Sequence, residues 1–492
     1  MDAEMTLGDI DLSTVKARSV TGVVTLISRS FVLQIISTAG FFLLSVFLGR
    51  PEIGLFIAIN DLVSILGYFS DVGLAASLIQ KKEKITLSDL RTTFTVQQIL
   101  VLTLLGLTLI LSPFISRYYD ISSSGIWLLY SLLAAFFLAS LKTIPSVILE
   151  RQLKFEILAA VEVIETTAFY LVAVFLAWRG SGVAAYAWAV IIRGVLGTGL
   201  IYFLAPWKIG LAVSRSSLKT LLSFGLPYQI NSLMAVVKDR FLNIALWRII
   251  GAEGVGIIGW AQTWSQKPLR FVMDNVTKVT FPSFSRMQDD PAQLKTGLEK
   301  TLQFISLITF PVVGGLAVLA PVAVSLIPRY SKWEVALLPL TLYCWNSAWA
   351  AVSTPLTNTL NALGKVKVNT YLMLMWTALA WGLTPALAGI FGFLGVAYAA
   401  GIIAVSSVVP VIIVHRLVKF SLPESVIKPA MATVIMLVIS WLLSRLLPIS
   451  VFFLVVNVLV SAGVYLLLVY LFFGRELVTD ATHIWYAFRQ KK

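Results

Sequence analysis

Residues 47–83 read FLGRPEIGLFIAINDLVSILGYFSDVGLAASLIQKKE. A mainly apolar run fills residues 53–80, and the stretch ends in the basic pair Lys81 and Lys82. A helix of about 20 apolar residues crosses the ~30 Å hydrocarbon core of a bilayer. The stretch therefore predicts a membrane-spanning helix that ends in a basic loop.

Runs of this kind recur along the whole chain of 492 residues, which is 58% hydrophobic and only 13% charged. Ordinary soluble domains carry about 25% charged residues, and the strands of membrane barrels are shorter and alternate in polarity. We therefore expect an all-α polytopic membrane protein. Hydropathy predicts about fourteen transmembrane helices, and twelve is the alternative count if two short runs are not spans. The predicted spans are 23–48, 53–80, 92–116, 124–142, 157–178, 182–204, 218–249, 252–273, 300–327, 334–361, 367–389, 392–415, 426–446 and 450–473.

The Lys and Arg residues between these runs are unequally distributed. One set of loops, together with the two ends of the chain, holds 26 of them, whereas the alternate loops hold six. Because basic residues accumulate in cytoplasmic loops, this bias predicts that both termini are cytoplasmic and that the number of spans is even. It also accounts for the formal net charge of +14 without a nucleic-acid partner. The first twenty residues lack the basic start and short apolar core of a cleaved signal peptide.

An internal repeat links the two halves of the chain. Gly49 and Gly54 align with Gly251 and Gly256, both at an offset of 202 residues, and SGVAAYAWAVII from residue 181 aligns with LGVAYAAGIIAV from residue 394. Each half then has six spans, so the halves share one orientation and are related by an axis along the membrane normal. We expect two parallel six-helix lobes around a central cavity, plus two extra C-terminal helices.

The repeat and the loops predict the following division of the chain. It consists of a cytoplasmic segment at 1–22, an N-terminal lobe at 23–204, a cytoplasmic linker at 205–217, a C-terminal lobe at 218–415, the extra helices at 426–473 and a cytoplasmic tail at 474–492.

Residues 47–83 resemble the amino-terminal signature of the polysaccharide flippases, the Wzx-like exporters of the MOP superfamily. That superfamily also contains the MATE drug exporters and the lipid II flippases. The resemblance rests on Leu48-Gly49, Glu52-x-Gly54, Asp71-x-Gly73-Leu74 and the exit SLIQKKE. In addition, LNALGKVKV at 360–368 resembles the loop after the tenth span of the same family.

The resemblance implies a transporter without enzymatic activity. Its cargo would be an undecaprenyl-pyrophosphate-linked oligosaccharide, the repeat unit of a cell-surface polysaccharide. Alternating access would move this cargo from the inner to the outer leaflet of the bacterial plasma membrane. The implied partners are the lipid-linked oligosaccharide, membrane lipids and polysaccharide polymerase machinery. No cofactor is implied, and coupling to a proton or Na⁺ is left open.

Charged residues inside the apolar runs are the candidate site. An ionisable group at the bilayer centre is costly and usually faces a cavity or a partner. The run SLMAVVKDRFLNIALWRIIG at 232–251 contains Lys238, Asp239 and Arg240. At ~100° per residue, Lys238 and Arg240 point to nearly opposite sides of a helix. Arg240 shares a stripe with Asn243 and Trp247, which we favour for the cavity, with Asp239 as partner to a neighbouring cation. An interlobe ion pair without a role in transport is the alternative.

Arg29 and Arg193 are the other cations predicted inside the first lobe. Glu165 and Arg193 lie at similar distances from the turn near Gly180, so they can pair on antiparallel helices. That pairing would make Glu165 and Arg193 structural and would leave Arg29 as the freer cation. The predicted cationic cavity consists of Arg29, Arg193, Lys238, Arg240, Asn243 and Trp247. Guanidinium groups suit a pyrophosphate, because they bind it through paired hydrogen bonds.

Acidic residues of the quoted stretch are the candidates for ion coupling. The spacing of Asp61, Ser64, Tyr68 and Asp71 would place them on one polar face of a single helix over 53–80. Asp61 is the deeper acid and the candidate for coupling to a proton or Na⁺, with ordinary polar packing as the alternative. Asp71 and the motif glycines Gly49, Gly54 and Gly73 are predicted to be structural.

The sequence predicts neither a metal site nor a catalytic site. His415, His483 and the single cysteine, Cys344, have no metal-ligand spacing, and one cysteine cannot form an intrachain disulfide. A MATE-like ion-coupled multidrug exporter would share the fold, but the buried Arg and Lys residues argue against a cavity for organic cations. An integral-membrane glycosyltransferase, glycan ligase or polymerase is the alternative from another class. Such enzymes commonly need a sizeable extracytoplasmic loop, and none of the predicted outer loops is long enough to hold one.

Overall fold

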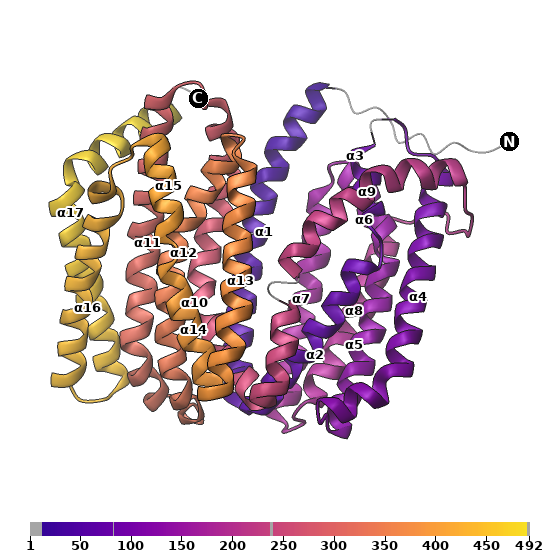
Figure 1. Ribbon diagram of the computed structural model, residues 1–492, viewed down its shortest axis with the longest axis horizontal. Coiled ribbons are helices and arrows are strands. Elements are labelled where there is room, and N and C mark those ends of the chain that lie inside the picture. Colours follow the sequence, from indigo (N-terminus) through magenta and orange to yellow (C-terminus); the bar gives the residue numbers. More distant parts are fainter. Residues whose placement is uncertain (1–11, 82, 237–239, 490–492) are drawn as a thin grey trace. The chain divides into compact units, whose positions relative to one another are not determined.

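The structure is a computed structural model that describes residues 12–81, 83–236 and 240–489 (Figure 1). Thirteen helices of the described part are long and apolar enough to cross a membrane. In these ranges every regular element is helical, which confirms the prediction of an all-α polytopic membrane protein.

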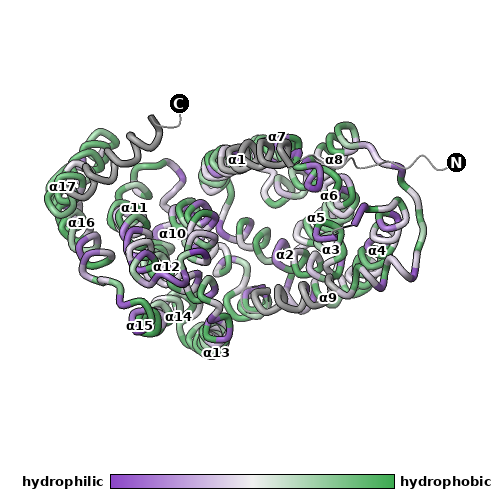
Figure 2. The backbone as a smooth tube through the Cα atoms, turned by 90° about the horizontal axis from the view of Figure 1, so that it is seen from above, coloured by the Kyte–Doolittle hydropathy of each residue, from purple (hydrophilic) through white to green (hydrophobic). Residues whose placement is uncertain are grey.

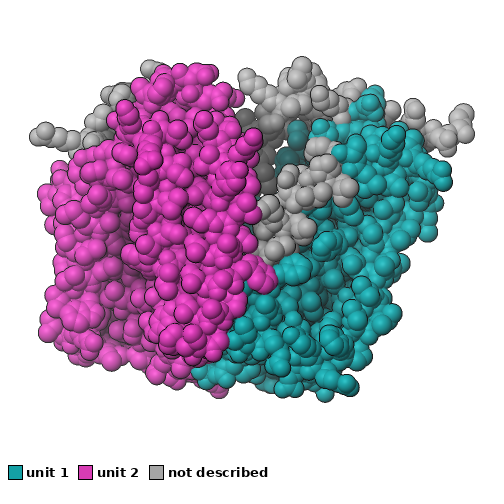
Figure 3. Space-filling view, viewed as in Figure 1, with its two compact units in different colours: residues 1–256 teal, residues 257–492 magenta. Residues whose placement is uncertain are grey.

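The chain divides into two compact units, Met1–Gly256 and Ile257–Lys492, which Figure 3 colours separately. The elements of the first unit are α1 (Leu12–Phe47), α2 (Arg50–Phe69), α3 (Leu74–Gln80), α4 (Leu87–Tyr118), α5 (Ser123–Leu141), α6 (Thr143–Arg151), α7 (Phe155–Trp178), α8 (Ala184–Leu204) and α9 (Arg215–Val236). Helix α10 (Leu242–Arg286) begins in this unit and continues into the second. The elements of the second unit that follow are α11 (Pro291–Leu326), η2 (Ser331–Ala336), α12 (Leu337–Ala362), α13 (Val366–Phe391), α14 (Phe393–Val405), α15 (Val408–Val418), η3 (Pro423–Ile427), α16 (Lys428–Leu446) and α17 (Val451–Arg489).

The division between the units lies further along the chain than the linker predicted at 205–217. Helix α9 packs against α2, α3 and α4, so it belongs with the first unit. One apolar core of this unit joins α3, α4, α6 and α9 through residues such as Leu74, Phe94, Ile144 and Leu221. The second unit has its own core between α10, α11, α12 and α15.

The span predicted at 53–80 is two helices, so the prediction of one continuous helix was wrong. Helix α2 ends at Phe69, and α3 starts only at Leu74. Gly73 has φ +76° and lies against the backbone of Gly225 in α9, where a Cβ atom would overlap the Gly225 carbonyl. Only glycine adopts this left-handed conformation without strain. The Asp71 carboxylate accepts hydrogen bonds from the backbone N–H groups of Gly73 (2.8 Å) and Ala75 (3.3 Å). Asp71 therefore caps α3 and does not continue the polar face of Asp61.

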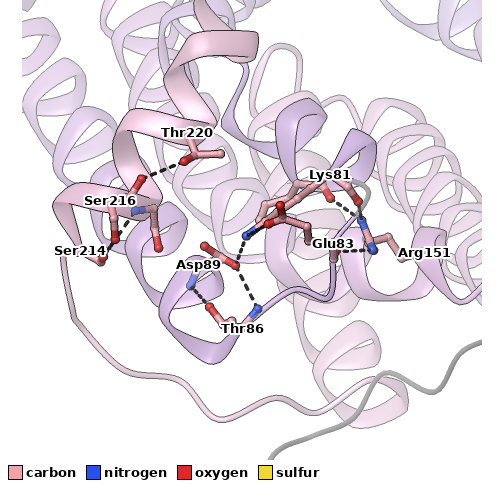
Figure 4. Close-up of polar contacts among 10 residues, drawn as sticks. Lys81, Glu83, Thr86, Asp89, Arg151, Ser214, Ser216 and Thr220 are labelled. Carbon is pink, nitrogen blue, oxygen red and sulfur yellow. Dashed lines mark hydrogen bonds and ion pairs between the residues drawn. The ribbon is translucent and has the colours of Figure 1, made fainter.

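The end of the signature stretch forms a junction between α3, α4 and α6 (Figure 4). Arg151, at the end of α6, donates hydrogen bonds to the backbone carbonyls of Leu78 (2.9 Å) and Lys81 (2.6 Å). Lys81 Nζ lies 2.7 Å from Asp89 Oδ2, and Asp89 forms a capping box with Thr86 at the start of α4. These bonds satisfy carbonyl groups at the end of α3 and N–H groups at the start of α4, which helix ends otherwise leave unpaired.

The predicted boundary between the seventh and eighth spans coincides with a break in α10. Gly251 has φ 66° and ψ 178°, which is not helical, although helix continues on both sides. The predicted span 218–249 is not among the thirteen candidate spans of the described part. It comprises α9, residues 237–239, which lie outside the described residues, and the first turns of α10.

Two glycines of the predicted repeat lie against each other within the first unit. A Cβ atom at Gly54 would overlap the carbonyl of Ala252, and a Cβ atom at Gly256 would overlap the carbonyl of Arg50. The two contacts correspond to each other in the repeat, because Gly54 and Arg50 lie 202 residues before Gly256 and Ala252. Arg50 Nη2 also lies 3.0 Å from Glu253 Oε1. The reciprocal contact supports the internal repeat and explains why both copies have glycine here.

Candidate functional site

The most enclosed acid of the predicted site is Asp61, on α2, whose exposed fraction is 2%. Its Oδ1 atom pairs with the guanidinium of Arg240, and its Oδ2 atom accepts a hydrogen bond of 2.8 Å from Asn243 Nδ2. Arg240 lies two residues before the start of α10, and Asn243 lies in the first turn of that helix. The two residues of the predicted stripe therefore meet the predicted coupling acid. The Asp61 side chain is 3% exposed and that of Arg240 is 42% exposed, so the ion pair has one buried and one accessible member.

Trp247, the third residue of the stripe, has a different environment. It is 3% exposed and stacks on Tyr119 after the end of α4, with ring centroids 4.7 Å apart and an angle of 27° between the planes. In this conformation Trp247 stabilises packing between α4 and α10, and its ring face is not open to a sugar.

Arg29 is not the freer cation, so that prediction was wrong. Its guanidinium lies 2.5 Å from the carboxylate of Glu162, which joins α1 to α7. Both side chains are about one-third exposed, at 29% and 37%. Glu162 was available in the sequence as an acid inside the apolar run 157–178, and this was the signal that could have identified the partner.

The predicted pair of Glu165 and Arg193 is confirmed, and Lys142 joins it. Glu165 is 4% exposed. Its carboxylate lies 2.6 Å from Lys142 Nζ and 3.7 Å from Arg193 Nε. The carboxylate packs against Gly197 of α8, where a Cβ atom would overlap it. Lys142 is the last residue of the predicted span 124–142, and its side chain turns toward α7.

The described cations of the predicted cavity therefore all have carboxylate partners. Arg29 pairs with Glu162, Arg193 with Glu165, and Arg240 with Asp61. Lys238 lies outside the described residues. The expectation of surplus deep positive charge does not hold for these three arginines. An anionic cargo that binds one of them has to compete with a carboxylate.

The second unit, considered by itself, contains polar groups inside a predicted span that the sequence analysis did not single out. On α10, Lys267 Nζ lies 5.9 Å from the ring centroid of Trp264, and Gln262 Nε2 donates a hydrogen bond of 2.9 Å to the hydroxyl of Tyr343. Lys267 falls inside the predicted span 252–273, so its position in the sequence was the signal. A cation, an amide and aromatic rings on one helix are suited to a hydroxyl-rich anionic molecule.

The motif residues are structural in this conformation. Gly49 is the N-cap of α2, Gly54 lies at the crossing with the Ala252 backbone, and Asp71 and Gly73 start α3. The described residues contain no group of three or more His, Cys, Asp or Glu side chains that could hold a metal ion.

Comparison with known proteins gives one family match. The model of the family described as "Polysaccharide biosynthesis protein" matches residues 43–337. This range includes Asp61, Glu165, Arg193 and Arg240 and most of the helices that position them.

Curated relatives are similar over part of their length. The sequence is 28% identical over 319 residues to an uncharacterized membrane protein in the cps region of Klebsiella pneumoniae, covering 61% of this chain and 62% of that one. It is 25% identical over 328 residues to the lipopolysaccharide biosynthesis protein WzxC of Escherichia coli K12, covering 65% and 64%. It is 25% identical over 256 residues to the teichuronic acid biosynthesis protein TuaB of Bacillus subtilis, covering 50% and 51%. The matches thus span less than two thirds of each relative's length.

Solved structures share the fold at low sequence identity. The lipid II flippase MurJ in an inward closed conformation superposes with a TM-score of 0.74 and 18% identity, covering 92% of this chain and 99% of that chain. An inward-facing multidrug resistance MATE family transporter of the MOP superfamily gives a TM-score of 0.56 and 17% identity, covering 81% and 99%. These similarities confirm the predicted fold class and carry no information about cargo.

Proposed function

The chain belongs to the polysaccharide biosynthesis protein family, and from this premise we propose that it is a flippase for a lipid-linked oligosaccharide. In this proposal the cargo is an undecaprenyl-pyrophosphate-linked repeat unit of a cell-surface polysaccharide. The protein moves it from the inner to the outer leaflet of a bacterial plasma membrane by alternating access. Both termini lie in the cytoplasm, as the 26-to-six distribution of basic residues indicates.

The names of two relatives place them in polysaccharide biosynthesis, but each name refers to a different polysaccharide. One relative is named for lipopolysaccharide and one for teichuronic acid. A flippase that recognises the lipid pyrophosphate and a few sugars fits this spread, because that part of the cargo is common to many polymers. Polymerase machinery that receives the repeat unit is the proposed partner.

The observation that carries the proposal is the Asp61–Arg240 pair. Charged groups inside membrane helices are expensive and mark pathways for ions and substrates. Arg240 presents a partly accessible guanidinium, which is the group best matched to a phosphate. Asp61 holds that guanidinium while the cargo is absent. Pyrophosphate binding at Arg240 would release Asp61, which could then take up a proton or Na⁺.

A MATE-like drug exporter is the second candidate, because one such transporter shares the fold. An exporter of organic cations would use its acids to bind the drug. In the described part of the first unit, Asp61, Glu162 and Glu165 are each paired with Arg or Lys, which disfavours that use. The family match also favours polysaccharide biosynthesis over drug export. The fold shared with a lipid II flippase favours a transporter over a glycan-joining enzyme.

Deletion of the gene followed by mass analysis of lipid-linked sugars tests the proposal. Cells without the protein should accumulate an intact, undecaprenyl-pyrophosphate-linked repeat unit that remains inaccessible to reagents outside the plasma membrane. Accumulation of a truncated repeat unit would indicate a glycosyltransferase. Normal lipid-linked sugars together with increased drug sensitivity would indicate a multidrug exporter.

A further inference from the structure

The segment between α8 and α9, residues 205–214, has no regular secondary structure and runs beside α4, and we call it the strap. Trp207 is 8% exposed and packs into the apolar core formed by α3, α4, α6 and α9. Its ring meets Phe94 edge-on, with centroids 5.3 Å apart. Further along, the backbone N–H groups of Ala212 and Ser214 each donate a hydrogen bond of 3.0 Å, to Thr95 Oγ1 and Thr92 Oγ1 respectively. The backbone of the strap is therefore fixed at several points.

Three apolar side chains of the strap face away from the protein. Ile209, Leu211 and Val213 are 56%, 76% and 54% exposed. Lys208 and Ala212 are exposed as well, and Gly210 is half-buried, so the exposed surface of the strap is continuous. The backbone bonds of Ala212 and Ser214 to α4 hold this surface outward. Figure 2 shows the segment at the periphery of the first unit beside α4, with hydrophobic residues along it.

The position of the strap on α4 corresponds to the edge of the hydrocarbon core. Helix α4 has 32 residues. At ~1.5 Å per residue it is about 48 Å long, roughly 18 Å more than the hydrocarbon core. If the excess is shared equally, the core begins about six residues after Leu87. The strap is bonded to Thr92 and Thr95, at this level, and the exposed residues Ile99 (57%) and Leu102 (56%) continue its apolar surface along α4.

The ends of the strap are basic. Lys208 precedes Ile209, and Arg215 and Lys219 lie in the first turns of α9; all three residues are exposed. The chain has no Asp or Glu from residue 166 to residue 238. Apolar side chains flanked by Lys and Arg are the pattern of segments that lie in the interface of a membrane with anionic lipids.

We propose that the strap is a lipid-binding element. Ile209, Leu211 and Val213 insert into the leaflet at this end of α4, and Lys208, Arg215 and Lys219 bind the headgroups of anionic phospholipids in that leaflet. The occupant is thus an anionic phospholipid, because the apolar surface is continuous with that of α4 and the flanking charge is positive. The strap leads directly into α9, which contacts Gly73 at Gly225. Lipid binding therefore positions α9, whatever cargo the protein carries.

Spin labelling tests the insertion. A nitroxide is attached at Leu211→Cys in a Cys344→Ala background. Two other labels serve as references: one at Leu107→Cys, an exposed position on α4, and one at Lys367→Cys, an exposed position in the first turn of α13. In phosphatidylglycerol vesicles the label at 211 should resemble the label at 107, with high accessibility to oxygen and low accessibility to a water-soluble nickel chelate. Accessibility like that at 367 overturns the insertion. Protection from both reagents also overturns it, because a protein surface then covers the strap.

Native mass spectrometry of the full chain tests the headgroup contact. The variant Lys208→Gln/Arg215→Gln/Lys219→Gln should lose preference for phosphatidylglycerol over phosphatidylcholine, by about fivefold per residue, the equivalent of ~1 kcal/mol for each basic residue near an anionic surface. The matched control is Lys365→Gln/Lys367→Gln/Arg416→Gln, which removes the same charge from exposed residues of the second unit. An equal loss in both variants, or a loss in neither, overturns the proposal. Neither experiment requires flipping activity, so its failure is distinguishable from failure of the proposed function.

Discussion

Replacement of Asp61 by asparagine tests whether the enclosed ion pair couples transport to an ion gradient. Asparagine preserves the shape and can still accept the hydrogen bond from Asn243, but it removes the charge that holds Arg240. Because the Arg240 side chain is 42% exposed, water can solvate its charge in the variant. We therefore expect a loss of about 1–2 kcal/mol in the free energy of unfolding, below the ~3–5 kcal/mol typical of a fully buried pair.

The effect on the cargo should have the opposite sign to the effect on stability. If Asp61 and pyrophosphate compete for Arg240, the Asp61→Asn variant should bind the cargo more tightly. Coupling free energies between two ligands are typically ~1–3 kcal/mol, which corresponds to about 5- to 150-fold in affinity. If Asp61 only orients Arg240 for the cargo, the variant should bind more weakly. The sign of the change therefore distinguishes the two roles.

The assay is flipping in vesicles of the lipid-linked oligosaccharide that cells lacking the protein accumulate. An imposed difference of ~1.7 pH units is worth about 2.3 kcal/mol per proton, or about 50-fold in the distribution of cargo if one proton is exchanged per cycle. A Na⁺ gradient of the same size is applied separately. The parent should respond to one gradient, and the Asp61→Asn variant to neither. Asp71→Asn is the control, because Asp71 caps α3 and should alter stability without altering the response.

An Asp61→Asn variant that responds to the gradient as the parent does would refute the reasoning. The pair would then be ordinary polar packing between α2 and the start of α10. If the parent itself responds to neither gradient, the membrane potential acting on the anionic cargo becomes the better explanation, and no coupling acid is needed.

Three further predictions concern stability and topology. Glu165→Gln should lower the free energy of unfolding by about 2–4 kcal/mol, because the change removes a buried carboxylate with two cationic partners. Glu162→Gln should lower it by less than ~1 kcal/mol, because both members of the Arg29–Glu162 pair are about one-third exposed. Equal losses of the two variants in denaturant unfolding would contradict this difference. Gly54→Ala should cost about 1–3 kcal/mol through overpacking against the Ala252 carbonyl, measured as a lower Tm in detergent, and an unchanged Tm would show that the crossing relaxes. Cysteines at Ser123 and Ser217, in a background without the native cysteine, should be labelled from opposite sides of the membrane; labelling from one side would refute the predicted topology.

The fold was largely predictable because hydropathy and basic-residue bias act over whole segments. Twenty consecutive apolar residues specify a span regardless of the details inside it. The break between α2 and α3 was not predictable in this way, because residues 53–80 remain mainly apolar across it. The break depends on the left-handed backbone of Gly73 and on its contact with Gly225, about 150 residues later in the chain. A distant packing contact of this kind leaves no trace in local periodicity.

The candidate site was partly predictable for a related reason. Depth can be read from a sequence by counting residues from the nearest turn, and this identified Glu165 and Arg193 as partners. Which residue of a neighbouring helix turns toward the pair depends on helix rotation. Counting therefore missed Lys142, which approaches Glu165 more closely than Arg193 does. The same limit explains why Glu162 was not identified as the partner of Arg29.

The pairing of the described arginines changes how an anionic cargo can enter such a site. A cavity with surplus positive charge would attract pyrophosphate strongly and release it slowly. In this chain Arg240 is paired with Asp61, so the proposed pyrophosphate cargo would gain only the difference between two anionic partners. A small difference keeps binding reversible, which a transporter needs in order to release its cargo on the other side. A ligand shifts a conformational equilibrium only through its unequal affinity for the two states. Exchange of Asp61 for pyrophosphate supplies that inequality if the pair can form in one conformation and is separated in the other.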